Sequence, residues 1–400
     1  MVLEKGLYGH PAAGRWWSDT RDDFLLKRFK QKGWFIKRAT SDPCFFHLIK
    51  YGVDRGKDSL VPGESHAWFI IHTDDVDMVG ESKEVMKEVN DIIHDKWNTK
   101  IVDSDYVLGV KREIAEHPKG LTSTMSMPAF IDQMVFTFQA ELSEFKKKHR
   151  VSIPFPEGLI LSLSDPVREG EHQEFLDKGS QRLTGSLLWA VRHVSPESNY
   201  GITQISKLMA KPTEASWNAS LNMLAYLELT KNRGIRFCSW IDDVPVAYSD
   251  ASNKDDRHNG KCHGGHIVSW GGPIVVKSAQ LLHVGMNSSY NEYMQIMMCA
   301  KHVVWLRQLL AEIGLEFIVD KPTVIYGDNN QANNLCTDNM VTSGNMYYRT
   351  CYHYNKELKR DGIIDIQYIK SADNPADGQS KALPRAVLKR HEATVTGHHP

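Results

Sequence analysis

The chain has 400 residues, 41% of them hydrophobic, which is enough for two or more domains, and no apolar run approaches the length of a membrane span. Lysine plus arginine (48) nearly balances aspartate plus glutamate (49), so a nucleic-acid partner would have to be met by local basic surfaces. Six cysteines without a Cys-x-x-Cys pair argue against a disulfide framework or a zinc knuckle, and no signal peptide is recognisable, so we expect an intracellular protein, cytoplasmic and/or nuclear, without membrane contact.

The first part of the chain predicts a helix and then strands around an acidic pair. Helical spacing over residues 16–32 is followed by the strand-like runs CFFHLI, AWFIIHT and VDMVG. The last two runs predict a hairpin with Asp74 and Asp75 at its tip, and a helix over 82–97 follows. Adjacent carboxylates at a hairpin tip repel each other, which favours a divalent metal as their partner. A solvated turn is the alternative.

The middle of the chain predicts two short strands, over 105–114 and 120–127, and a helix over 129–142. A proline-rich linker and a mainly helical connector follow. The basic residues Lys146, Lys147 and Lys148 come after the helix, where they could hold a phosphate backbone as point charges. A solvated helix face explains them equally simply.

The last 160 residues place four carboxylates at strand ends and helix starts. Asp250 ends a strand that two further strands follow, Glu292 lies near the start of a long helix, Asp328 ends a fourth strand, and Asp377 opens the last helix. The order of three strands, helix, strand, helix, strand and helix matches that of a ribonuclease H domain, but strand-to-helix alternation alone leaves many α/β folds open.

These four carboxylates would converge if they share one rim of the sheet. They would then bind two Mg²⁺ ions, with Mn²⁺ as the alternative, one activating water and one stabilising the leaving oxygen of a phosphodiester. Taken singly, an aspartate after a strand is more often a turn or a helix cap.

Three amide side chains follow the fourth strand directly: Asn329, Asn330 and Gln331. At a helix N-terminus they could meet a phosphate or a ribose 2′-OH, and helix capping is the alternative.

From Leu7 to about Val395 the chain resembles the C-terminal part of the Pol polyprotein of copia-type retrotransposons. Eleven collinear stretches carry this resemblance: LYGHPAAGRWW, SDPCFF, HTDDVDMVG, YVLGV, TGSLLWAV, ISKLMAKPTEASW, YSDAS, NSSYNEY, VVWLRQLL, YGDNNQA and PADGQSKALP. The resemblance implies an α/β and α+β multidomain fold. Its parts would be a partial reverse transcriptase palm (1–115), a thumb-like segment and linker (116–165), a mainly helical connection (166–238) and a ribonuclease H-like domain (239–400).

The resemblance assigns Asp74 and Asp75 to the paired polymerase aspartates, and Arg15 also matches the family's pattern. The family's third aspartate and its fingers subdomain lie before the LYG stretch, and this chain begins six residues before Leu7. We therefore expect no polymerase activity from the chain alone, with upstream Pol segments or a second subunit as partners.

For the C-terminal half, the resemblance implies Mg²⁺-dependent hydrolysis of RNA in RNA–DNA hybrids by Asp250, Glu292, Asp328 and Asp377. Tyr290 departs from the pattern, because an acidic residue commonly stands there in the family. The alternative is a catalytically inactive retrotransposon remnant that at most binds nucleic acid.

Overall fold

A computed structural model describes residues 10–50, 64–73, 75–100, 105–252, 256–285, 287–336 and 349–399. The chain divides into two compact units: Met1–Leu108 with Trp305–Asp320 form unit 1, and Gly109–Val304 with Lys321–Pro400 form unit 2. Both combine helices with sheets, so the expected α/β and α+β fold class is confirmed. No helix within the described ranges is both long and apolar enough to cross a membrane.

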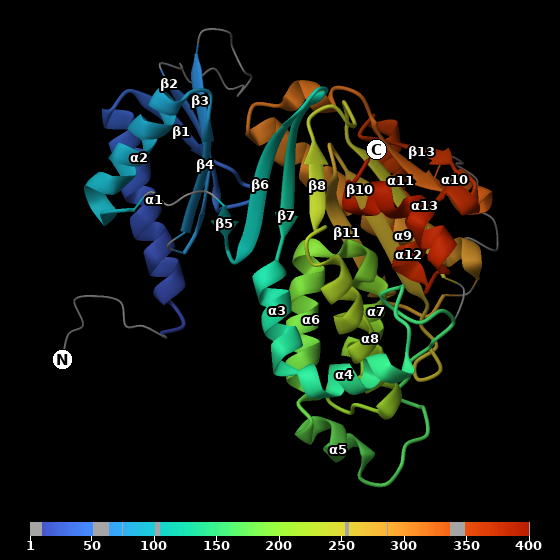
Figure 1. The fold of residues 1–400 in the computed structure, drawn as a ribbon. Coiled ribbons are helices and arrows are strands. Elements are labelled where there is room, and N and C mark those ends of the chain that lie inside the picture. The colour runs from blue at the N-terminus through green and yellow to red at the C-terminus, as the bar shows by residue number, and fades with distance from the viewer. Residues whose placement is uncertain are drawn as a thin grey trace. The chain divides into compact units, whose positions relative to one another are not determined.

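Unit 1 contains an antiparallel sheet of order β1-β2-β3-β4 with two main helices (Figure 1). Leu25 and Phe29 of α1 and Val89 and Ile93 of α2 are buried in one apolar core with Phe69 of the sheet. Strand β1 was not predicted, whereas the other strands and both helices were. The elements are α1 (Ala13–Gln31), β1 (Trp34–Arg38), β2 (Phe45–Lys50), β3 (Ser65–His72), β4 (Asp75–Gly80), α2 (Lys83–Trp97) and the 3-10 helix η2 (Glu316–Val319).

Unit 2 begins with the antiparallel strands β6, β7 and β8 and a group of helices. The predicted helix over 129–142 is two helices that break at Phe138. The apolar faces of these helices form one core. The short strand β5 (Tyr106–Val107) belongs to unit 1. The elements of unit 2 up to residue 238 are β6 (Val110–His117), β7 (Gly120–Ser126), α3 (Pro128–Thr137), α4 (Gln139–Lys148), α5 (Glu171–Asp177), α6 (Ser180–Val194), η1 (Pro196–Ser198), α7 (Asn199–Ser206), α8 (Glu214–Thr230) and β8 (Ile235–Cys238).

A five-stranded mixed sheet of order β11-β10-β9-β12-β13 completes unit 2. Strands β9, β10 and β11 are antiparallel neighbours, whereas β12 is parallel to both β9 and β13. The predicted succession of strands and helices is present, except that Asp377 opens a separate single turn and the last helix begins only at Arg385. The elements are β9 (Val246–Ala251), β10 (His263–Ser269), β11 (Pro273–Gln280), α9 (Ser288–Glu312), β12 (Thr323–Gly327), α10 (Asn330–Leu335), α11 (Arg349–Arg360), β13 (Ile364–Tyr368), η4 (Ser371–Asp373), α12 (Asp377–Ser380) and α13 (Arg385–Thr396).

Helix α12 is a single turn that packs directly on the sheet. Gly265 of β10 pairs with Asp250 of β9, and a Cβ atom at Gly265 would lie 2.6 Å from the carbonyl carbon of Gln379. Buried Asn374 ties the preceding turn to β9, because its amide donates to the Ser249 carbonyl over 2.9 Å. Glycine on the strand and asparagine in the turn thus place the start of α12 beside Asp250.

Candidate metal centre

Three of the predicted carboxylates lie together at one edge of the five-stranded sheet. Asp250 is in β9, and Asp328 directly follows β12, the parallel neighbour of β9. Asp377 is the first residue of α12. One carboxylate oxygen from each residue lies within 4.8 Å of the others. The parallel pairing and the close approach of α12 bring these side chains together from distant parts of the sequence.

Glu292, the fourth predicted carboxylate, lies beside this cluster in the first turns of α9. It is 7% exposed, and its Oε2 atom accepts a hydrogen bond of 3.1 Å from the Ala251 amide. Burial, followed by the charges of Asp250 and Asp328, raises the pKa of Glu292 to about 10. Glu292 is thus fixed to the residue that follows Asp250.

Asp250 is the most buried carboxylate of the cluster, with 2% exposure. Burial, and then the charge of Asp377, raises its pKa to about 7. The Ser380 hydroxyl donates a hydrogen bond to Asp250 Oδ2. Holding these carboxylates together without a cation therefore costs free energy.

Lys381 partly offsets this repulsion. Its Nζ atom lies 3.0 Å from Asp377 Oδ1 and 4.0 Å from Asp250 Oδ2. Burial favours a lower pKa for Lys381, but Asp250 and Asp377 together raise it. Neither Ser380 nor Lys381 was predicted from the sequence. The four-residue spacing of Asp377 and Lys381 in the quoted stretch PADGQSKALP was the available signal.

The donor set fits a hard divalent cation. Three aspartates supply oxygen ligands, which suit Mg²⁺ and Mn²⁺ better than softer metals. Burial and the charge of Asp377 raise the pKa of Asp250, and a bound cation would offset both effects. The residues present therefore match the metal that the sequence predicts.

The amide side chains after Asp328 have mainly local contacts. Asn329 Oδ1 accepts hydrogen bonds from the amides of Gln331 and Ala332 and so caps α10. The Ser289 hydroxyl donates to the Gln331 side chain over 2.8 Å. Asn330 is exposed in the first position of α10. The helix-capping alternative therefore describes Asn329, whereas Asn330 and Gln331 are exposed.

The polymerase-type residues in unit 1 form no comparable centre within the described part of the chain. Asp75 is exposed at the start of β4, opposite His72, and Asp74 lies outside the described residues. Arg15 is exposed on α1, with its Nε atom 3.8 Å from Asp19. Among the described residues, no other potential metal ligands complete a cluster of three or more with Asp75.

The three lysines form the last turn of α4. Lys146 forms an ion pair with Glu228, and Lys148 with Glu144 over 3.0 Å. Lys147 is exposed. Two of the three charges are therefore already paired within the protein.

Comparison with known proteins shows a resemblance to transposon Pol polyproteins along nearly the whole chain. No family model matches the chain. The retrovirus-related Pol polyprotein from transposon TNT 1-94 of Nicotiana tabacum is 24% identical over 399 residues, which cover 99% of this chain and 28% of that protein. The corresponding polyprotein from transposon RE2 of Arabidopsis thaliana is 25% identical over 398 residues, which cover 98% of this chain and 25% of that protein. The chain spans about a quarter of the length of these curated relatives.

Two solved structures are similar to parts of the chain. LC11-RNase H1 in complex with an RNA/DNA hybrid covers 34% of this chain and 92% of its own, with 12% identity and a TM-score of 0.26. The match to the foamy viral protease-reverse transcriptase in complex with an RNA/DNA hybrid covers 88% of this chain and 37% of that protein, with 13% identity and a TM-score of 0.40. The polyprotein matches confirm the resemblance to copia-type Pol polyproteins that the motifs indicated.

Proposed function

We propose that this retrotransposon Pol-like chain is a Mg²⁺-dependent ribonuclease H that cleaves the RNA strand of RNA–DNA hybrids. The observation that carries the proposal is the convergence of Asp250, Asp328 and Asp377 within 4.8 Å at the sheet edge. The expected order of strands and helices around these residues supports it. The similarity to transposon Pol polyproteins supports a nucleic acid as the substrate.

Asp250, Asp328 and Asp377 would hold the divalent metal, with Glu292 beside them. Such a metal lowers the pKa of bound water and stabilises negative charge on phosphate oxygens. Within the chain, Ser380 orients Asp250 by its hydrogen bond, and the Ala251 amide orients Glu292. Asn330 is an exposed amide directly after this edge that would meet the substrate backbone.

Lys381 has a positioning role in this proposal. Its ammonium group reduces repulsion between Asp250 and Asp377 before the metal arrives. The same contact supports the alternative of an inactive remnant, because a lysine that remained there would take the place of the metal. Metal binding and hybrid cleavage distinguish the two alternatives.

For unit 1 we propose a reverse transcriptase palm that is inactive by itself. Exposed Asp75 has no clustered metal ligands in the described part of the chain, which supports this proposal. Polymerase activity would then require further Pol segments or a second subunit. The division into palm (1–115), thumb and linker (116–165), connection (166–238) and ribonuclease H-like domain (239–400) is part of the same proposal.

The test is cleavage of a hybrid with labelled RNA, in Mg²⁺ and in EDTA. We expect product from the wild type in Mg²⁺ only, and a loss of at least about a hundredfold in Asp250→Asn, because it removes a ligand charge. Asp243→Asn is the matched control, since Asp243 is exposed and outside the cluster. Metal-independent product, or full activity of Asp250→Asn, would refute the assignment. Absence of product from folded wild type would favour the remnant.

A further inference from the structure

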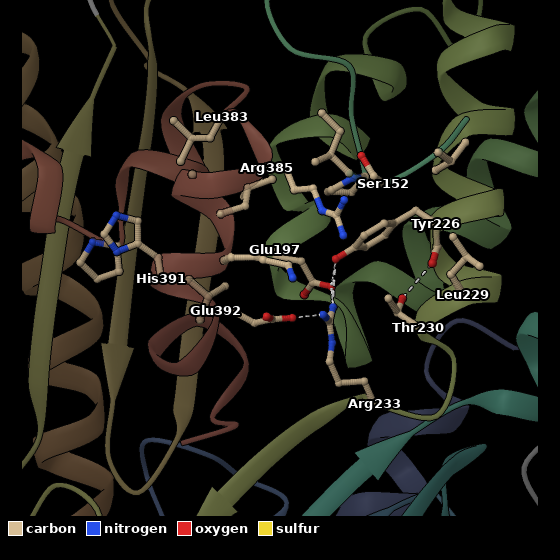
Figure 2. Close-up of a pocket in the computed structure, with 18 of the residues that line it drawn as sticks. Ser152, Glu197, Tyr226, Leu229, Thr230, Arg233, Leu383, Arg385, His391 and Glu392 are labelled. Carbon is tan, nitrogen blue, oxygen red and sulfur yellow. Dashed lines mark hydrogen bonds and ion pairs between the residues drawn. The ribbon is translucent and has the colours of Figure 1, made fainter. Parts of the chain in front are cut away.

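Unit 2 contains a cavity of about 300 Å³ between the helical connector and the end of the chain (Figure 2). Its lining comes from the segment after α4, from η1 and α8, and from α12 and α13. Asp250, Asp328 and Asp377 are not among its lining residues. The volume lies at the small end of the range for ligand pockets.

A network of charged and polar side chains lines one part of the cavity. Arg233 forms ion pairs with Glu197 and Glu392, and its Nη2 atom donates to the Tyr226 hydroxyl over 3.1 Å. That hydroxyl donates to Glu197 over 3.2 Å. Burial, and then the charge of Glu197, raises the pKa of Tyr226, so the phenol stays neutral. The network therefore carries one more negative than positive charge.

Three further cations line the same cavity. Arg150, Arg385 and Lys389 are exposed, and none has an ion-pair partner in the part of the chain that the structure describes. Figure 2 shows the Arg385 side chain extending from α13 toward the wall that carries Ser152 and Tyr226. With the buried network included, the charges sum to a surplus of two positive charges. This surplus favours an anionic occupant.

The rest of the wall suits an uncharged ring. Val151, Ile153, Leu383 and Leu388 supply apolar surface. Gln379 also lines the cavity, is 1% exposed, and neither its amide nitrogen nor its oxygen has a hydrogen-bond partner among the described residues. These two amide atoms are enclosed by the protein and are not part of the accessible surface of the cavity, so the apolar side chains supply the contact surface for the ring.

We propose that this cavity binds a mononucleotide. The phosphate monoester, which carries up to two negative charges, lies against Arg385, Lys389 and Arg150, and the base enters the apolar part beside Tyr226. This binding site lies outside the carboxylate cluster. It does not depend on the proposed nuclease activity.

The experiment is calorimetric titration of the full chain with adenosine 5′-monophosphate in EDTA. We expect the mononucleotide to bind at least about tenfold more tightly than adenosine or inorganic phosphate alone, since each fragment makes only part of the contacts. Arg385→Gln should raise Kd about tenfold through the lost charge-assisted hydrogen bonds. Arg390→Gln is the matched control on α13: it removes the same charge, but Arg390 does not line the cavity.

A second variant and a second readout locate the ligand. Ser152→Trp places a large ring at the cavity and should abolish binding while circular dichroism stays unchanged. Hydrogen exchange should show protection of peptides from 150–154 and 385–392 on adding the mononucleotide. The proposal is overturned by absence of binding, by equal weakening in Arg390→Gln, by unchanged binding in Ser152→Trp, or by equally tight binding of either fragment. Because EDTA removes divalent metals, none of these outcomes depends on hybrid cleavage.

Discussion

Replacing Asp250 by asparagine should stabilise the metal-free protein while destroying its response to metal. Asp250 is almost fully buried beside Asp377, and its pKa is raised from 3.8 to about 7. A raised pKa means that the folded state binds the proton more tightly than the unfolded state does. The contribution of protonated Asp250 to the free energy of unfolding is therefore complete below pH 4 and is lost as pH rises through 7.

The size of the expected stabilisation follows from the pKa shift of Asp250. About three pKa units correspond to roughly 4 kcal/mol at a pH above both values, and relaxation around the cluster reduces that figure. Asparagine keeps an oxygen that can accept from Ser380 but carries no charge. We expect a gain of about 2–4 kcal/mol in EDTA at pH 8, and little gain at pH 4.

The assay is denaturant unfolding in EDTA between pH 4 and pH 8, with hydrogen exchange of β9 peptides to report on unit 2. Wild type should lose stability as pH rises, whereas Asp250→Asn should show a flatter profile. Mg²⁺ at pH 8 should stabilise the wild type and not the variant. Asp243→Asn, in an exposed position, should behave as the wild type. Equal pH profiles for wild type and Asp250→Asn would refute the electrostatic reasoning.

Four further predictions concern other residues of the chain. Lys381→Met should lower metal-free stability at pH 8, because Asp250 and Asp377 lose their nearby ammonium group, and unchanged denaturation midpoints would contradict this. Gly265→Ala should displace α12 and reduce hybrid cleavage at least about tenfold, which a cleavage assay checks. Gly185→Ala lies at an exposed helix position with open space, so it should stabilise the protein by about 0.5–1 kcal/mol, which unfolding curves check. Burial, and then the charge of His66, lowers the pKa of His47 to about 3, so the stability that neutral His47 contributes above pH 6.5 should fall as pH decreases toward 3. His47→Phe should flatten this pH dependence, measured by hydrogen exchange of β2 peptides. Equal slopes for wild type and variant would exclude this role of His47.

Much of the sheet around the metal centre could be predicted because its signals are local. Each strand is a short apolar run that ends in turn residues, and Asp250 and Asp328 stand at such ends. The sequence predicted that they would meet only if they shared one rim of the sheet, and the parallel pairing of β12 with β9 meets that condition. The distance between their oxygens required the structure, because it depends on how closely α12 approaches Gly265.

The parts that sequence reasoning missed depend on contacts between distant segments. Strand β8 has only four residues, and it becomes a strand by pairing with β7, with Ile235 opposite Met125. Gly234, with a φ of 61°, permits this approach, since a Cβ atom there would lie 1.9 Å from the Met125 carbonyl oxygen. The cavity likewise joins segments that no sequence pattern relates. Pairing partners and enclosed volumes are tertiary properties, and short-range propensity does not contain them.

The most direct test of the metal centre is an anomalous-scattering map from crystals of the full chain soaked in Mn²⁺. We expect a manganese peak among the carboxylates of Asp250, Asp328 and Asp377, with Lys381 moved away from Asp377. A fully occupied Lys381–Asp377 ion pair with no manganese peak at the cluster would contradict it.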